Sequence, residues 1–114
     1  MSRLAVLCII AACGYPKAGP PPAALHPAAI EAARAKFPTA TAESLEQGRQ
    51  DFLGHCNKCH GYPALGAYSE PQWIKIVPRM GDKAGLIPSQ SDQVLQFIVA
   101  ARGPQSAPAP APAK

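Results

Sequence analysis

With 114 residues, the chain is long enough for one small domain and too short for two. The formal net charge of +4 lies outside the middle of the chain, because six basic and six acidic side chains cancel between Glu43 and Gly103. This balance, without a basic stripe interleaved with aromatic residues, argues against a nucleic-acid partner. Nine of the 14 prolines fall within residues 16–27 and 104–112, and such stretches favour extended, solvated backbone. We therefore expect the folded part to run from Thr41 to Gly103.

Residues 1–12 have the pattern of an export signal. Arg3 precedes an apolar run over residues 4–10, which is far shorter than the ~20 residues that a membrane-spanning helix needs. Residues 10–13 (Ile-Ala-Ala-Cys) then resemble the lipobox of bacterial lipoproteins. In that family the cysteine is acylated and becomes the first residue of the mature protein, which predicts lipidation of Cys13 and an anchor on the periplasmic side of a bacterial membrane. An ordinary signal peptide with an incidental cysteine is the alternative.

Residues 13–40 are rich in proline and alanine, and we interpret them as a tether. Within the tether, residues 28–36 favour a short helix, and Pro27 suits its first position. Ile30, Ala33 and Phe37 would then share one face. The sequence leaves open whether that face packs on the folded domain, and an unpacked helix of this length would fray.

The first helix of the domain is predicted to begin at Thr41. Threonine is a favoured N-cap residue, and Glu43 and Glu46 follow where the helix dipole favours acidic side chains. The apolar face of this helix consists of Leu45, Gly48, Phe52 and Leu53. The helix leads directly into the most specific motif of the chain.

That motif is Cys-Asn-Lys-Cys-His at residues 56–60, the Cys-x-x-Cys-His pattern typical of covalently attached c-type haem. Two thiols at this spacing can each form a thioether with one vinyl group of a porphyrin, and the adjacent imidazole then binds the iron from one face. Zinc ribbons and dithiol oxidoreductases also use Cys-x-x-Cys. A zinc ribbon needs a second ligand pair, whereas Cys8 and Cys13 belong to the export signal, and no strand–helix–strand context is expected. We therefore predict one haem c held by Cys56, Cys59 and His60.

A second helix is predicted to begin at Ser69, with Gln72 three residues on in capping-box spacing, and to end or kink at Pro78. Met80, the one methionine besides the initiator, follows where a turn would direct its side chain inward. A thioether is a soft, neutral ligand that raises the haem potential, so Met80 is the predicted second axial ligand. Filling the core is its alternative role.

Two further side chains bear on the predicted haem site. Trp73 either donates its indole N–H to a haem propionate or forms a wall of the pocket. His55 is the main rival for the second axial position, but it directly precedes Cys56 and would reach the opposite face of the haem with difficulty. We expect His55 to lie at the surface.

A third helix is predicted to open at Ser89 or Ser91, to carry Phe97 and to stop at Gly103. The arrangement resembles the short monohaem class I c-type cytochromes. In that family an N-terminal helix with a glycine, and an aromatic residue four positions later, crosses a C-terminal helix that bears an aromatic residue. Gly48 and Phe52 match the first helix, and Phe97 matches the second.

The resemblance implies an all-α, cytochrome c-like fold of about three helices around one covalent haem in residues 41–103, with disordered tails that include residues 104–114. The spacing between His60 and Met80 is shorter than in mitochondrial-type cytochromes, so their middle loops are not carried over.

The function expected from these features is that of a one-electron carrier, not an enzyme. Its iron would cycle between Fe(III) and Fe(II) with His60 and Met80 bound, and its partners would be periplasmic redox proteins or a membrane oxidoreductase. The alternative is a haem-based sensor or peroxidase-like protein whose sixth ligand is labile or absent. A metal-free dithiol protein is a third interpretation.

Overall fold

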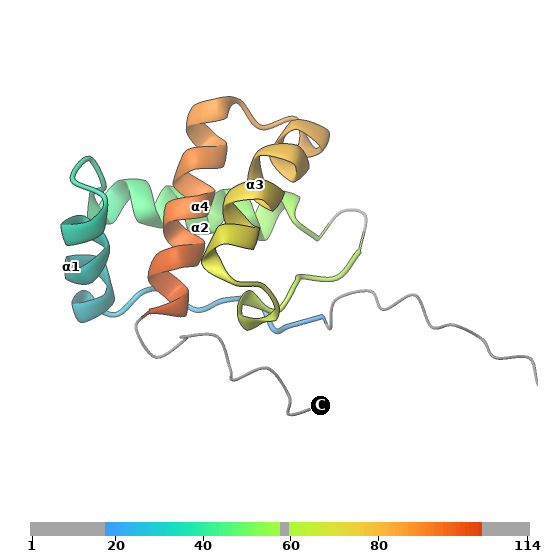
Figure 1. The fold of residues 1–114 in the computed structure, drawn as a ribbon. Coiled ribbons are helices and arrows are strands. Elements are labelled where there is room, and N and C mark those ends of the chain that lie inside the picture. Colours follow the sequence, from blue (N-terminus) through green and yellow to red (C-terminus); the bar gives the residue numbers. More distant parts are fainter. Residues whose placement is uncertain (1–17, 58–59, 104–114) are drawn as a thin grey trace, which may run out of the picture.

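A computed structural model describes residues 18–57 and 60–103, and this part of the chain is α-helical (Figure 1). The elements are α1 (Pro27–Lys36), α2 (Ala42–His55), the short 3-10 turn η1 (Leu65–Ala67), α3 (Glu70–Ala84) and α4 (Pro88–Arg102). The described ranges contain no strand, and Ala18 and Pro63 form an isolated antiparallel bridge. The predicted all-α class is confirmed. None of these helices has the length and hydropathy needed to cross a membrane.

The centre of the core lies where α2 runs across α4 (Figure 1). The buried rings of Phe52 and Phe97 lie with their centroids 6.2 Å apart. Gly48 permits this approach, because a Cβ atom there would lie 2.1 Å from the carbonyl oxygen of Gln93. The expected crossing of a helix carrying Gly48 and Phe52 with a helix carrying Phe97 is therefore observed.

Adding one methyl group at this crossing tests how tightly the two helices are packed. We expect Gly48→Ala to lower the free energy of unfolding by about 3 kcal/mol, the upper end of the usual cost of overpacking. Gly54→Ala in the same helix is the control, since a Cβ there meets nothing within 4 Å. The control should gain about 0.5–1 kcal/mol from helix propensity. Urea unfolding measures both, and equal stabilities of the two variants would contradict the close crossing.

The predicted N-terminal caps of the first two domain helices are confirmed. The Thr41 hydroxyl oxygen accepts from the Ser44 N–H at 3.0 Å, and the Ser44 hydroxyl oxygen accepts from the Thr41 N–H at 2.9 Å. At α3, the Ser69 hydroxyl oxygen accepts from the Gln72 N–H at 3.3 Å, and the Gln72 side-chain oxygen accepts from the Ser69 N–H at 2.8 Å. Both are reciprocal capping boxes; the sequence predicted the box at Ser69, whereas at Thr41 it predicted the N-cap alone.

The helix does not end at Pro78, which was one of the two outcomes expected there, because α3 continues to Ala84 and stops at Gly85, whose φ is +80°. Proline lacks the N–H that would bond the Ile74 carbonyl four residues earlier. Both Pro78 and Ile74 lie on the exposed side of the helix, where water can bond that carbonyl.

The predicted start of the third domain helix at Ser89 or Ser91 is also wrong. The helix α4 starts at Pro88, and the side-chain oxygen of Gln90 accepts from the Ile87 N–H at 3.0 Å. Proline suits the first turn because its fixed φ matches the helix and the missing N–H has no helical partner there. The predicted stop is confirmed, since α4 ends at Arg102 and Gly103 has a φ of +59°.

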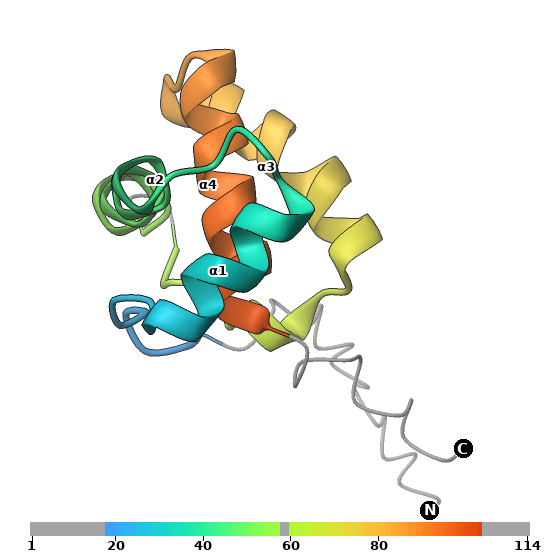
Figure 2. The ribbon, with the colours of Figure 1, turned by 90° about the vertical axis from the view of Figure 1, so that its left-hand side faces the viewer.

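The packed part of the chain extends N-terminal of Thr41. Helix α1 lies against α4 (Figure 2), which settles the question that the sequence left open. Their contact contains a second buried cluster formed by Ala33, Ala40, Leu45 and Ala100, with Leu25, Ile30 and Phe37 packed against it.

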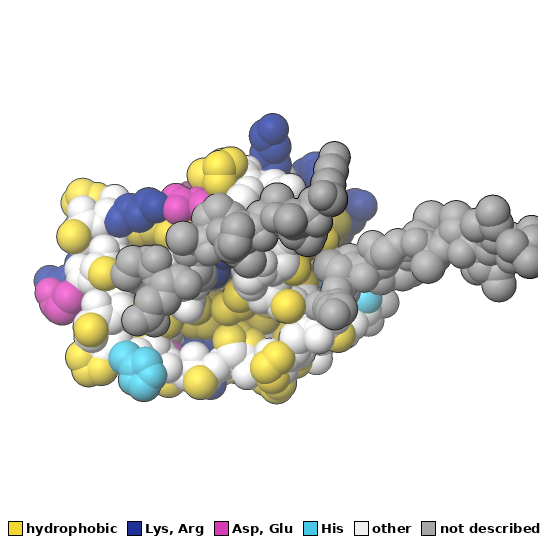
Figure 3. All heavy atoms as spheres, turned by 60° about the horizontal axis from the view of Figure 1, so that its bottom comes forward, with side chains coloured by type: hydrophobic (Ala, Val, Ile, Leu, Met, Phe, Trp, Pro, Cys, Tyr) yellow, Lys and Arg dark blue, Asp and Glu magenta, His cyan; other side chains and the backbone are white. Residues whose placement is uncertain are grey.

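On the face shown in Figure 3, hydrophobic side chains also gather around a central hollow.

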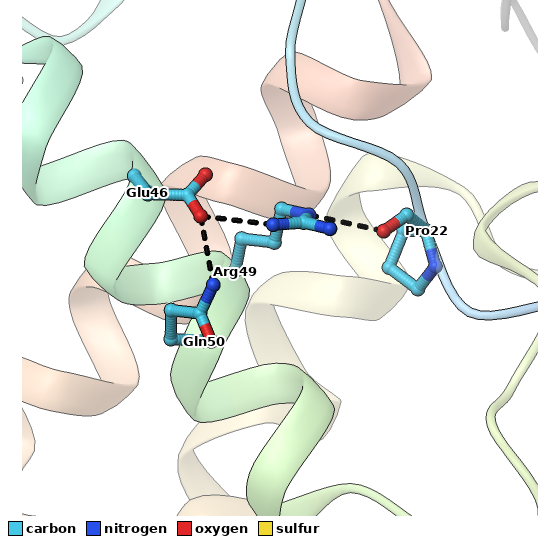
Figure 4. Close-up of polar contacts among 4 residues, drawn as sticks. All are labelled: Pro22, Glu46, Arg49 and Gln50. Atoms are coloured by element: carbon cyan, nitrogen blue, oxygen red, sulfur yellow. Dashed lines mark hydrogen bonds and ion pairs between the residues drawn. The ribbon is translucent and has the colours of Figure 1, made fainter.

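The segment before α1 is held against α2 by a polar cluster (Figure 4). The Arg49 side chain donates from Nε to the Pro22 carbonyl oxygen at 3.0 Å and pairs with Glu46 at 2.8 Å. Glu46 also accepts from the Gln50 side-chain amide at 2.8 Å. The bond from Gln50, together with the bond and charge of Arg49, holds the pKa of Glu46 below its usual value.

Candidate cofactor site

A largely apolar cavity of about 600 Å³ lies between the end of α2, the segment that follows it, α3 and α4. This volume is within the range of about 300–1,000 Å³ that is usual for ligand and cofactor sites. Its apolar walls include Phe52, Trp73, Val77, Leu86, Val94 and Ile98. Its side chains with nitrogen or sulfur donors include His55, Cys56, His60, Met80 and Lys83. The cavity thus brings together most of the predicted site residues that the structure describes.

His60 borders this cavity with its imidazole held by a backbone contact. Its Nδ1 lies 2.8 Å from the carbonyl oxygen of Gly61. A carbonyl oxygen only accepts, so Nδ1 is the donor, and Nε2 is the ring nitrogen left for another partner. Metal-binding histidines are commonly oriented in this way, with the second ring nitrogen donating to a backbone carbonyl. The His60 ring is therefore oriented as that of a metal ligand commonly is.

Cys56 is the C-cap residue of α2, and its half-buried thiol is free on the cavity wall. Burial, with a smaller contribution from the Asp51 carboxylate, raises the pKa of Cys56 to about 11. The thiol is therefore protonated near neutral pH. Because the thiolate is the reactive form, burial makes the Cys56 thiol a weak nucleophile in this environment. The predicted partner Cys59, and the predicted lipidation site Cys13, lie outside the described residues.

Met80 reaches the cavity from a continuous helix, so its predicted place in a turn after Pro78 is wrong. Trp73, Val77 and Met80 recur at helical spacing and all line the cavity. Seven residues separate Trp73 from Met80, which is about 10 Å along the helix axis. Met80 is 41% exposed, which places it at the mouth of the cavity, whereas Trp73 is buried.

Trp73 forms a wall of the cavity, one of the two roles expected of it. Its indole N–H donates to the Leu65 carbonyl oxygen at 3.0 Å, and Tyr68 meets its ring edge-on with centroids 5.1 Å apart. The same carbonyl oxygen accepts from Arg102 Nε at 3.1 Å. These bonds tie η1 to the first turn of α3 and the last turn of α4.

Two neighbours of the site differ from the expectation from sequence. His55 was expected at the surface, and Asp51 was not identified. His55 is half-buried and lines the cavity, and its Nδ1 donates to the Asp51 carbonyl oxygen at 3.0 Å. The Asp51 side chain is buried. Its Oδ1 accepts from Gln47 at 3.2 Å, while no described group bonds Oδ2. Helical spacing could have indicated the burial of Asp51, since it lies three positions after Gly48 and four before His55 and so shares their face of the helix.

The donor set suits a cofactor that brings most of its own metal ligands. Among the described residues, no group of three or more His, Cys, Asp and Glu side chains could hold a metal ion. A haem iron is already held by four porphyrin nitrogens and takes only axial ligands from the protein. One histidine with a free Nε2 and one thioether beside an apolar cavity fit that requirement.

No protein-family model matches this chain, and comparisons with curated proteins and with solved structures found no match either.

Proposed function

We propose that the protein is a small monohaem cytochrome c that carries one electron at a time. Cys56 and Cys59 would attach the haem, and His60 and Met80 would be its axial ligands. The observation that carries the proposal is that the Cys56 thiol, the His60 imidazole and the Met80 side chain border one apolar cavity of about 600 Å³. The Cys-x-x-Cys-His motif at residues 56–60 gives the same interpretation independently.

Haem c, when bound, supplies reversible one-electron chemistry between Fe(III) and Fe(II). The protein then orients the ligands and sets the potential. The bond from His60 Nδ1 to the Gly61 carbonyl fixes the ring orientation and increases the basicity of Nε2. The Met80 thioether and the apolar walls both favour the ferrous state, since neither stabilises the additional charge of ferric iron. The proposed role is that of an electron carrier and not of an enzyme, and it assigns no acid–base pair or activated nucleophile.

The cytochrome c-like fold is part of this proposal. It is supported by the crossing of α2 and α4 through Gly48, Phe52 and Phe97, which is the feature that the resemblance to class I cytochromes rests on. Residues 41–103 contain three α-helices, α2, α3 and α4, as expected, while α1 is an additional packed helix and α3 continues past Pro78.

A second candidate is a haem-based sensor or peroxidase-like protein, in which Met80 leaves the iron and a small ligand binds. The exposure of Met80 at the mouth of the cavity favours it. The two candidates differ in carbon monoxide binding by the reduced protein, which is rapid only when the sixth position is open or labile. The third interpretation, a metal-free dithiol protein, predicts no Soret absorption after production with a c-type maturation system.

The proposal is tested chemically by detecting the covalent bonds between the protein and the haem. In protein produced with a c-type maturation system, the intact mass should exceed that of the polypeptide by one haem, and the haem should stay attached in acidified organic solvent. A mass equal to that of the polypeptide alone would contradict the proposal. Asn57→Ala, which leaves both cysteines and His60 in place, is the matched control and should carry the haem.

We also propose that the protein is exported and anchored by a lipid on Cys13, on the periplasmic side of a bacterial membrane. Cys13 lies five positions before Ala18, the first described residue, which bridges Pro63. An extended chain spans at most about 3.6 Å per residue, so the anchor would hold the domain within ~18 Å of the membrane surface. Among the expected partners, this distance favours a membrane oxidoreductase over a freely diffusing periplasmic protein.

Replacing the proposed lipidation site should change where the protein is found. We expect Cys13→Ala to leave the membrane fraction almost completely or to remain as an unprocessed precursor, because the lipid on Cys13 is the proposed anchor. Cys8→Ala, which changes the other cysteine of the signal, should stay with the membrane. Fractionation with immunoblotting measures both variants, and a mature Cys13→Ala protein found in the membrane would contradict the anchor.

A further inference from the structure

The segment that follows His60 is covered by the first residues of the described chain. Residues 18–22, here named the strap, run beside residues 61–64. Ala18 and Pro63 form an antiparallel bridge, and the Gly19 N–H donates to the Tyr62 carbonyl oxygen at 2.7 Å. Two chain segments more than forty positions apart in sequence are therefore joined immediately after the predicted haem ligand.

The contact between the strap and this segment is too close for a side chain at Gly19. A Cβ atom at Gly19 would lie 2.8 Å from Ala64 Cα, and backbone cannot yield as the end of a flexible side chain can. From the other side the contact is tight, since a Cβ atom at Gly61 would lie 3.1 Å from the Cβ of Ala18. At Gly19 the two segments thus meet backbone against backbone.

Both segments are also fixed to helix α2. The strap ends at Pro22, whose carbonyl oxygen accepts from Arg49 (Figure 4). In the covered segment, the Tyr62 hydroxyl donates to the Leu53 carbonyl oxygen at 2.8 Å, and its ring stacks on Phe52 with centroids 5.7 Å apart. Residues 61–64 are therefore held between α2 on one side and the strap on the other.

We propose that the strap is a positioning element for His60, and that Gly19 is its main positioning residue. The imidazole is oriented by the Gly61 carbonyl oxygen, and Gly61 belongs to the segment that the strap covers. Between α2 and α3 the described residues have regular structure only in η1, so this segment depends on outside contacts for its position. Precise ligand geometry needs such support from surrounding contacts. The inference rests on the proposed function, because it takes His60 to be the iron ligand.

The test compares Gly19→Ala and Gly19→Pro with a matched control in the full-length protein produced with a c-type maturation system. Gly19→Ala introduces the close contact with Ala64, and Gly19→Pro also removes the N–H that bonds Tyr62. Gly66→Ala is the control, because it adds the same methyl group where nothing lies within 4 Å. One readout is amide hydrogen exchange, and the other is the electron paramagnetic resonance spectrum of the ferric protein with its reduction potential.

In both Gly19 variants we expect residues 60–64 to exchange at least ~10-fold faster, while α4 keeps its protection. The ferric spectrum and the potential should shift with them, since both respond to the orientation of the imidazole plane. Gly66→Ala should match the unaltered protein in each readout. Unchanged exchange and spectrum in the Gly19 variants, or equal loss of protection in α4, would overturn the positioning role. An unaltered protein without haem would overturn the proposed function instead, and the exchange data would still decide whether the strap fixes residues 60–64.

Discussion

The Cys56→Ala, Cys59→Ala double variant is expected to be largely unfolded after export, because it cannot hold haem covalently. The packed residues within 18–103 are only slightly more than the ~70–80 below which a single core rarely supplies more than about 3–5 kcal/mol. An empty cavity lowers this small stability further, since its walls include the core residues Phe52, Trp73 and Val94. At about 24 cal/mol per Å³, leaving a quarter of the cavity of about 600 Å³ empty would cost about 4 kcal/mol. This cost is close to the whole stability of a marginal domain.

Circular dichroism and urea unfolding measure this effect. The double variant should have lost most of its helical signal and should show no cooperative transition. Asn57→Ala, between the two cysteines, should fold like the unaltered protein. A native-like helical spectrum and a cooperative urea transition in the double variant without haem would show that the helices fold without the cofactor.

The second large effect is expected at Met80. Met80→Ala should keep the covalent haem, because Cys56, Cys59 and His60 are unchanged, but it should lose the sixth ligand. We expect its reduction potential to fall by at least ~0.1 V, since axial ligands set haem potentials over a range of about 0.8 V. The reduced variant should also bind carbon monoxide rapidly, which the unaltered protein should not.

Ile74→Ala is the matched control for Met80→Ala. Ile74 lies on the same helix and is 50% exposed, against 41% for Met80, but it does not line the cavity. Its replacement should leave both the potential and carbon monoxide binding unchanged. If unaltered protein and Met80→Ala have the same potential, Met80 is not a ligand and the sensor or peroxidase-like candidate is favoured.

Parts of the fold that depend on neighbouring residues could be predicted from the sequence. The N-cap at Thr41 and the capping box at Ser69 involve only residues within one helical turn, so the pattern was sufficient. The expectation that α3 could end at Pro78 was wrong because the cost of a helical proline depends on which side of the helix faces water. That side is fixed by packing against α4, which local sequence does not contain.

The packing of α1 could not be predicted for a related reason. Helical spacing placed Ile30, Ala33 and Phe37 on one face, and that face is the packed one, but spacing does not show what the face contacts. Its burial depends on Leu45 and Ala100, which lie far along the chain. The same limit applies to the strap, whose proline-rich sequence gave no sign of the backbone contact with residues 61–64.

At the candidate site, the motif predicted haem attachment at Cys56 and ligation by His60 from spacing alone, and both residues line the same cavity. His55 was expected at the surface because it directly precedes Cys56 and would reach the opposite face of the haem with difficulty. Its partial burial depends instead on how the end of α2 packs. Asp51 was missed because an acidic residue in an amphipathic helix is usually exposed.

The most direct test of the central claim is the optical spectrum of the protein, oxidised and reduced, after production with a c-type maturation system. A His60/Met80 carrier predicts sharp α and β bands in the reduced state. It also predicts a weak far-red methionine-to-ferric band in the oxidised state, absent from Met80→Ala and retained in Ile74→Ala. A protein without a Soret band would contradict haem binding. A high-spin spectrum would contradict axial ligation by Met80.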